Sequence, residues 1–331
     1  MLQSLDPSHF TQLPTPNAHW VLQEAGQTLA CCSLWWNSFH QTFDPKGQAI
    51  PGQNPQTEAS PDRIGTIGHL KATCPQAALT LLNHACDELR QRGCTLALGP
   101  MDGTTWHAYR CATDWRNGPP FWGEPTLDPS WVDWFTQAGF TPVMTYESRL
   151  CTNLRQTWPP RRRRHRLPPI SLGSAQGIDP ADLLPQIYPL VMASFRRQPF
   201  FQPLPQEVFY QHYRPLLSHL DPRLVQLAWA SDGSALTLPD KKLVGLVLSM
   251  PDQLAPTDPP RLIIKTLAIL PDRAYAGLGY SLLEAAHQAA AQQGYTQAIH
   301  ALMHRNNVSL NLSRRYSQPF REYMLMGKRL G

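Results

Sequence analysis

The chain has 331 residues, a length that favours two domains over one. Hydrophobic residues make up 42% and charged residues 16% of it, which predicts a buried core and excludes a wholly disordered chain. The net charge of +5 comes from one run, Arg161–Arg166, because removing its five arginines leaves 24 basic and 24 acidic residues. A nucleic-acid-binding domain would spread its basic charge over a face, so the surplus is a local feature here.

Several other classes of protein are excluded by simple patterns. No run approaches the ~20 apolar residues of a membrane span, and the first ten residues lack the basic and apolar regions of a signal peptide. The seven cysteines are odd in number, form no CxxC pair and all lie before residue 152. We therefore expect reduced thiols in a cytoplasmic protein, with neither a disulfide framework nor a metal site.

A segment rich in proline and arginine divides the chain in two. Residues 154–169 hold two proline pairs around the arginine run, a composition typical of an extended linker. Nine of the ten tryptophans lie at or before Trp158, so the composition changes across this segment. We predict an N-terminal domain over 1–153 and a C-terminal domain over 170–331. The polar stretch 44–61 is predicted to be a long loop.

The N-terminal half predicts alternating strands and helices. Ala78, Leu82, Ala85 and Leu89 share one face of a predicted helix that follows Pro75 and ends before Gly93. The predicted elements in chain order are a strand over 63–72, a helix over 75–92, a strand over 95–98, a helix over 130–138 and a strand over 141–150.

The C-terminal half repeats this order. Its predicted elements are helices over 184–195 and 206–220, strands over 224–230 and 243–250 paired across a turn near Asp232-Gly233, a strand over 262–270, a helix over 281–293, a strand over 295–303, a short helix over 307–316 and a strand over 321–330. Pro185 and Pro189 leave the start of the first helix open. Both halves thus contain strand, helix ending in glycine, strand, helix and strand, which indicates a repeat at the level of pattern.

One turn carries the pattern of a phosphate site. The strand that ends near Leu270 leads into Gly277-x-Gly279, which opens a helix, and main-chain amides in such a turn converge on one point. A P-loop is excluded because no Lys-Ser/Thr follows Gly279, and a dinucleotide fingerprint is excluded because its third glycine is Leu282 here. A glycine turn that only caps the helix is the alternative that these residues leave open.

The same stretch resembles the acyl-CoA loop of the GNAT acyltransferases, V-x-P-x-x-[Q/R]-x-x-G-x-[G/A]. Ile269, Pro271, Gly277 and Gly279 fall in register with that pattern. Ala274 departs from it, since the family has Gln or Arg at this position, and the neighbouring Arg273 could supply the charge. The resemblance covers roughly 170–330.

Other segments extend the resemblance. The segment 304–309 followed by Arg315-Tyr316 is similar to the "N-x-x-[A/S]…Y" region of the family, with Asn307 at the asparagine that contacts the cofactor. The segments 98–106, 119–121 and 138–140 resemble the "GP…" and "PP…GF" segments of bacterial tandem-GNAT proteins.

The resemblance implies an α/β (α+β) fold of two tandem GNAT-like domains, each a mixed, mostly antiparallel twisted sheet flanked by helices. It implies transfer of an acyl group from acetyl-CoA, or another acyl-CoA, to a primary amine of a small molecule or protein, bound in a cleft between the domains. The N-terminal half lacks the glycine loop, and no acyl-CoA is expected there. The residues implied to contact acyl-CoA are Leu267, Ile269, Arg273, Ala274, Tyr275, Gly277, Leu278, Gly279, Tyr280 and Asn307.

Catalytic roles follow from the same resemblance. A main-chain amide near 267–269 would stabilise the oxyanion. Tyr316, with Tyr323 as second candidate, would protonate the departing thiolate, and His304 or Asp272 would accept the proton of the amine. An aromatic group could line the acceptor pocket, although its two helical members, Trp131 and Trp134, fit core packing better. Its remaining members are Trp106, Trp115, Phe121 and Trp122.

Two functions of other classes stay open. The alanine at 274 and the lack of an obvious base suggest a protein that binds acyl-CoA as a scaffold without turnover. The run 161–166 suggests an aminoacyl-tRNA-dependent transferase or an RNA-binding module, because arginines bind phosphates. The oligomeric state is not indicated by the sequence.

Overall fold

The structure is a computed structural model that describes residues 1–10, 14–41, 62–156, 168–230, 242–255 and 260–331. The described strands are β1 (Leu2–Leu5), β2 (Ala18–Glu24), β3 (Gln27–Gln41), β4 (Asp62–Ala72), β5 (Leu96–Gly99), β6 (Cys111–Ala112), β7 (Thr141–Cys151), β8 (Ile170–Ser174), β9 (Val225–Ala230), β10 (Lys242–Pro251), β11 (Arg261–Ile269), β12 (Gln297–His304) and β13 (Gln318–Arg329). The described helices are α1 (Pro75–Gln91), α2 (Ser130–Gln137), α3 (Pro180–Phe195), α4 (Gln206–His219), α5 (Leu278–Gln292) and α6 (Val308–Ser313), with short 3-10 turns η1 (Pro7–His9), η2 (Pro222–Leu224) and η4 (Arg273–Tyr275).

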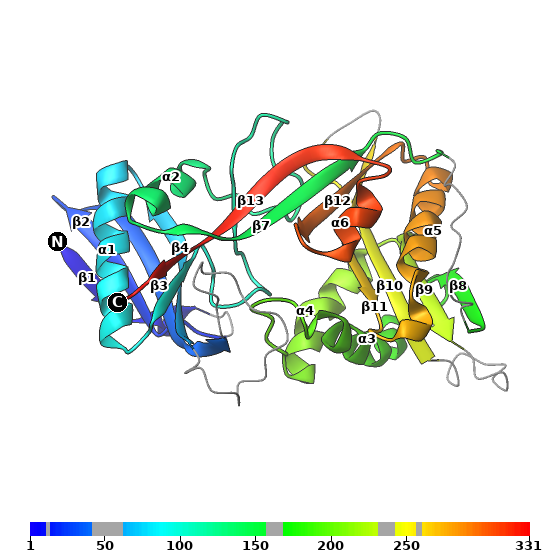
Figure 1. Cartoon of the computed structure of the whole chain (residues 1–331), viewed down its shortest axis with the longest axis horizontal. Helices are drawn as coiled ribbons and strands as arrows, with labels where there is room; N and C mark the ends of the chain where they lie inside the picture. Colours follow the sequence, from blue (N-terminus) through cyan, green and yellow to red (C-terminus); the bar gives the residue numbers. More distant parts are fainter. Residues whose placement is uncertain (11–13, 42–61, 157–167, 231–241, 256–259) are drawn as a thin grey trace.

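One sheet runs through both halves of the molecule (Figure 1). Its strand order is β1-β2-β3-β4-β5-β13-β7-β12-β11-β10-β9-β8, with β6 paired to β13. At its centre the halves exchange strands: β13 pairs with β5 of the N-terminal half, and β7 pairs with β12 of the C-terminal half. The tandem, mostly antiparallel α/β fold that we predicted is confirmed. The two predicted sheets are fused, however, because each half covers the open edge of the other.

The predicted repeat is visible in the two parallel strand pairs. β4 pairs with β5 over Ile64–Thr66, and β11 pairs with β12 over Arg261–Ile264. A helix connects the strands of each pair, α1 in the first and α5 in the second, as parallel neighbours require. The helices and strands that the sequence predicted are all present within a few residues of their predicted bounds. The predicted loop over 44–61 and the predicted turn near Asp232-Gly233 lie outside the described residues.

Helix α3 begins earlier than its prolines suggested. The Asp179 side chain accepts a hydrogen bond from the Ala181 amide at 2.8 Å, which caps the helix at its first turn. Pro185 and Pro189 lie inside the helix and remove two backbone donors. The buried face of the helix, which includes Ile187, compensates for this loss by packing on the sheet.

Apolar side chains fill both faces of the sheet. In the N-terminal half, α1 and α2 cover one face (Figure 1). In the C-terminal half, α3 and α4 pack on one face and α5 on the other. All seven cysteines are free thiols, of which Cys74 is exposed and Cys31 half-buried. Among the described helices, none is both long enough and apolar enough to cross a membrane.

Candidate active site

Strands β11 and β12 separate in the middle of the C-terminal half. They pair as far as Ile264 and His300, whereas the strands themselves continue to Ile269 and His304. A bulge lies at the point of separation, because Lys265 is the extra residue between the pairs Leu248–Thr266 and Ser249–Ile264. The separation leaves an opening with one strand on each side.

Main-chain groups of β11 face this opening. The Leu270 amide donates to the Val244 carbonyl of β10 at 2.9 Å, so alternate residues, Leu267 and Ile269, direct their amides the other way. The Ile269 amide donates to Ser194 Oγ of α3 at 3.2 Å. The Leu267 amide therefore faces the opening where β12 no longer pairs with β11, a position suited to an oxyanion donor.

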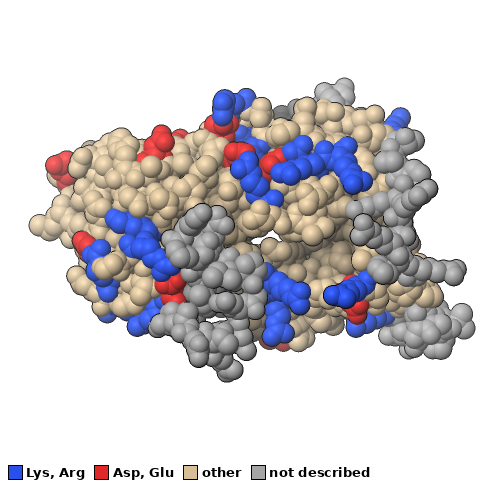
Figure 2. Space-filling model, viewed as in Figure 1, with Lys and Arg blue, Asp and Glu red and all other residues tan. Residues whose placement is uncertain are grey.

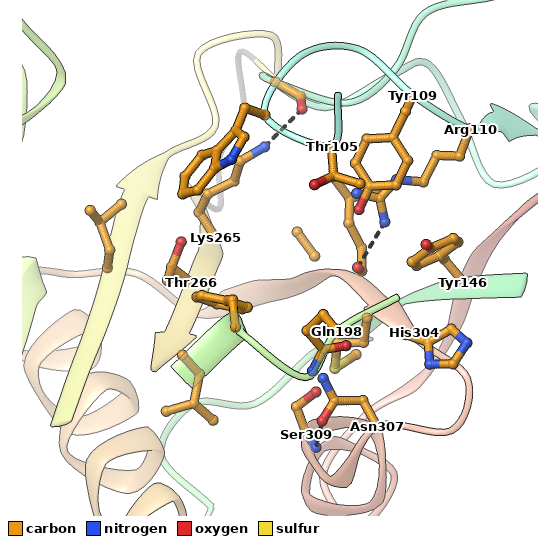
Figure 3. Close-up of a pocket in the computed structure, with 18 of the residues that line it drawn as sticks. Thr105, Tyr109, Arg110, Tyr146, Gln198, Lys265, Thr266, His304, Asn307 and Ser309 are labelled. Carbon is orange, nitrogen blue, oxygen red and sulfur yellow. Dashed lines mark hydrogen bonds between the residues drawn. The ribbon is translucent and has the colours of Figure 1, made fainter. Parts of the chain in front are cut away.

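A cavity of about 630 Å³ continues from this opening toward the N-terminal half. Its walls come from residues 105–110 and 123–125 of the N-terminal half, the strands β11 and β12, the helices α3 and α4, and the start of α6 (Figure 3). Figure 2 shows a hollow at the centre of one face of the molecule, with Lys and Arg side chains on both sides of it. Both halves of the chain thus build one pocket.

The first turn of α5 offers the predicted phosphate cradle. Gly277 is the residue before the helix and has a φ of +94°, a conformation that side chains disfavour. A Cβ at Gly277 would meet no atom within 4 Å, and one at Gly279 would meet Leu312 at 3.5 Å. The open space, the amides of Gly277, Leu278 and Gly279 and the positive end of the helix dipole fit a phosphate group.

The loop before α5 is held by its own aspartate. Asp272 accepts a hydrogen bond from the Ala274 amide at 2.8 Å and so caps η4. Arg273 and Ala274 are exposed, and Tyr275 packs at the edge of the core under α5. Leu278 and Tyr280 face that core and are buried, so only their main chain is available to a ligand.

His304 and Asn307 lie together at one end of the cavity (Figure 3). The ring of His304 contacts Tyr146 of β7, with 5.4 Å between centroids. Burial, and next the charge of Arg110, lower the pKa of His304, so its ring is neutral at neutral pH and can accept a proton. Asn307 caps α6 by accepting a hydrogen bond from the Ser309 amide at 3.3 Å.

The two candidate tyrosines lie elsewhere. Tyr316 is buried below α5 and its hydroxyl bonds to that of Tyr280 at 3.2 Å; burial raises its pKa to about 12. Tyr323 is fully buried in β13 and bonds to Glu124 and Ser148. Neither tyrosine is among the residues that line the cavity.

Of the aromatic group, Trp106 lines the cavity and its indole Nε1 donates to the Gln202 carbonyl at 2.7 Å. Trp131 packs in the N-terminal core, Trp134 lies at its margin, and the ring of Trp115 covers the Arg321 guanidinium at 4.6 Å. The acceptor-pocket prediction thus fits Trp106, and the core-packing prediction fits the two helical tryptophans.

Several cavity residues were missed by the sequence analysis. Arg110 and Lys265 approach the cavity from opposite halves of the chain, and Tyr146 enters it from β7 (Figure 3). His300 of β12 lies at the wall and its Nε2 is 2.9 Å from His287 Nε2 of α5. Only the tertiary fold brings these residues together, and none of them belongs to a motif that the sequence shows.

The equivalent opening in the N-terminal half is closed. The chain after β5 stays bonded to β4, because the Met101 amide donates to the Ile67 carbonyl at 2.9 Å. Next to it, the His69 amide donates to Asp102 Oδ1 at 2.7 Å, and Met101 is fully buried. The chain enters α1 through Cys74-Pro75, without a glycine loop.

Comparison with known proteins agrees with this geometry. The acetyltransferase (GNAT) family model matches residues 186–316. A GCN5-related N-acetyltransferase from Sphaerobacter thermophilus is similar in structure at 12% identity, with a TM-score of 0.52 over 94% of this chain and 80% of that one.

Two further structures are similar. A fungal GCN5-related glucosamine N-acetyltransferase region within a multi-domain GH3 β-N-acetylglucosaminidase has 12% identity and a TM-score of 0.51, over 94% of this chain and 33% of that one. A tandem GNAT protein from the clavulanic acid biosynthesis pathway has 13% identity and a TM-score of 0.49, over 95% and 83%. No curated protein sequence matches the chain.

The two halves share one fold, and the opened strand pair lies in the C-terminal half, where the family model matches. Residues 186–316 are a GNAT domain, and the similarity in fold to the Sphaerobacter protein extends over the N-terminal half as well. Identities this low concern the fold and leave the substrate open.

Proposed function

We propose that the chain is an acyl-CoA-dependent N-acyltransferase that transfers an acyl group, from acetyl-CoA or another acyl-CoA, to a primary amine of a small molecule or protein. The observation that carries the proposal is the opening between β11 and β12, which lies next to the glycine turn of α5. A thioester would lie in the opening while its diphosphate lies on the helix amides. The boundaries 1–153, 154–169 and 170–331 stay predictions, as does a cytoplasmic location.

The proposed contacts with acyl-CoA are mostly main-chain ones. The amides of Gly277, Leu278 and Gly279 would surround the diphosphate, with Tyr280 next to them, although its amide already donates to the Gly277 carbonyl at 3.2 Å. The Leu267 amide would face the acyl carbonyl, and Ile269, whose amide donates to Ser194 Oγ, would border the pantetheine. The exposed Arg273 stands where its charge can reach a phosphate, whereas Ala274 offers none. Tyr275 and Asn307 border the same region.

The chemistry requires a neutral amine. His304 is neutral and faces the cavity, so it can take the proton of the attacking amine. The Leu267 amide would stabilise the oxyanion of the tetrahedral intermediate. The thiolate leaves as the amide bond forms. For Tyr316 to donate a proton to it, the Tyr316 hydroxyl would have to break its hydrogen bond to Tyr280 and bond to the sulfur instead.

The test is acetyl-CoA binding followed by turnover. Acetyl-CoA at 100 times its dissociation constant should stabilise the protein by roughly 2.7 kcal/mol. Loss of the thioester in the presence of a mixed amine pool would then show catalysis. Binding without turnover of any amine would favour the scaffold alternative, and no binding would reject the proposal. The arginine run behind the RNA-binding alternative lies outside the described residues.

A further inference from the structure

Most charged side chains that line the cavity are basic. They are Arg110 and Lys265, together with histidines from several elements. The single carboxylate among its described lining residues is Glu124, and that group is already bonded. Its Oε1 accepts from Arg321 Nε at 2.8 Å and from the Tyr323 hydroxyl, and its Oε2 accepts from the Phe121 amide at 2.9 Å. The cavity thus offers no free carboxylate to a cationic ligand.

Arg110 is held in place with one donor unused. Its guanidinium carbon lies 3.8 Å from the ring centroid of Tyr109 and 4.2 Å from that of Tyr146, and its Nη1 donates to the Leu302 carbonyl at 3.0 Å. The residue is 7% exposed, and its Nε has no hydrogen-bond partner among the described residues. A buried guanidinium without an anion is costly, and a planar carboxylate matches its fork.

Arg110 is also fixed by its backbone. It has a φ of +69°, which is rare for a residue with a side chain, and its amide donates to the Pro100 carbonyl at 2.9 Å. Such a conformation persists only where the surroundings impose it. The guanidinium is therefore preorganised at the cavity rather than placed there by chance rotation of a flexible side chain.

Lys265 adds a second cation from the opposite wall (Figure 3). It is the bulged residue of β11, and its Nζ donates to the Gly123 carbonyl at 3.1 Å. Burial lowers its pKa to about 8, the charge of Arg110 acts in the same direction, and the charge of Glu124 acts in the opposite one. Burial and then the charge of Arg110 lower the pKa of His304. Burial lowers the pKa of His212 most, and the charges of His107 and then Lys265 lower it further. Basic side chains thus outnumber acidic ones around the cavity, which favours an anionic ligand.

One wall of the cavity is apolar and aromatic. Trp106 packs against Phe201 and Tyr213, with ring centroids 5.6 Å and 6.4 Å away, and these residues form the wall on the side of α4. This wall suits an apolar body, whereas the two cations suit an anionic group.

We propose that the acyl acceptor is an amino acid or a closely related amino carboxylate, whose carboxylate binds between Arg110 and Lys265 and whose apolar side chain contacts the wall around Trp106. This inference rests on the proposed function. In the reaction, the amine nitrogen bonds to the acyl carbon, the C–S bond of the thioester breaks, the amine proton leaves to a base, and CoA departs as a thiol after protonation. The products are an N-acyl amino carboxylate and CoA.

The test compares matched acceptors on the full-length protein with acetyl-CoA. The twenty amino acids are assayed against the corresponding amino acid amides, which keep the amine and lose the negative charge. At least one amino acid should react with a kcat/KM roughly 10- to 100-fold above its amide, the range expected for a lost charge-assisted hydrogen bond. O-phosphoethanolamine serves as an amine that carries a phosphate.

Variants locate the effect. Lys265→Met and Arg110→Met should each raise the KM for the amino acid by roughly tenfold or more, with little effect on its amide and on the dissociation constant of acetyl-CoA. Lys71→Met is the control, because Lys71 is exposed and lies outside the lining of the cavity. If Arg110→Met does not fold, Lys265→Met by itself still tests the inference.

Several results would overturn the inference. One is that an amide or the phosphorylated amine reacts as fast as every amino acid. Another is that the variants lower kcat/KM equally for the amide and the amino acid. A third is that acetyl-CoA binds but no amino acid is acylated. Failure of acetyl-CoA to bind at all would instead reject the proposed function, so the two failures are distinguishable.

Discussion

Glycine 277 allows a controlled test of the acyl-CoA site, because α5 carries a second glycine of the same kind at its other end. Gly277 and Gly294 have φ values of +94° and +88°, both are exposed, and neither would place a Cβ within 4 Å of another atom. Replacing either by Gln imposes a left-handed conformation on a side chain, at a cost of roughly 1–2 kcal/mol. The two variants should therefore lose similar stability.

Ligand binding separates the two variants. With acetyl-CoA at about 100 times its dissociation constant, the wild-type protein gains roughly 2.7 kcal/mol. At about 2–4 °C for each kcal/mol, the midpoint of thermal unfolding should rise by roughly 5–10 °C. We expect Gly294→Gln to keep this rise and Gly277→Gln to lose most of it, since the Gln side chain occupies the space for the diphosphate.

The measurement is a thermal unfolding scan of the three proteins with and without acetyl-CoA. A full rise in Gly277→Gln would refute the placement of the diphosphate at this turn. An equal loss in both variants would show that the effect arises from the helix as a whole rather than from its first turn.

Two other predictions concern charge. Folding lowers the pKa of Lys265 from 10.5 to about 8, so between these values the unfolded chain holds a proton that the folded chain has lost, and the contribution of Lys265 to stability should rise with pH. The stability of the wild type relative to Lys265→Met, measured by urea unfolding, should therefore increase across that interval, and a constant difference would contradict this. Arg321→Met removes the cation that pairs with the buried Glu124 carboxylate, which should cost about 3–5 kcal/mol in urea unfolding. Addition of Glu124→Gln should recover much of this loss, and strictly additive effects of the two substitutions would contradict the expectation.

Local patterns in the sequence predicted most of the fold. The helix α1 carries its apolar face at helical spacing, its proline at the first turn and Gly93 past its end, and the structure has it within one residue of the prediction. The hairpin of β2 and β3 was missed because it turns at Ala25-Gly26, with both residues at positive φ, where Asn-Gly would have been the clear signal.

The glycine turn could be predicted because its chemistry lies within a few consecutive residues. The cavity could not, because it depends on contacts over long separations. Arg110 donates to Leu302, 192 residues away, and Lys265 donates to Gly123, 142 residues away. Neither pairing follows from periodicity or composition, and the exchange of β7 and β13 that brings them together leaves no mark in the pattern of either strand.

The exchange of β7 and β13 has a consequence for how the chain can be cut. A fragment that stops at residue 153 would carry β7 without its neighbour β12 and would leave β5 without β13. The complementary fragment would carry β12 and β13 without their neighbours β7 and β5. Neither piece should be soluble when produced by itself, whereas co-production should restore a complex from the two. Gene truncation at the centre of the chain is therefore a poor route to an isolated catalytic unit.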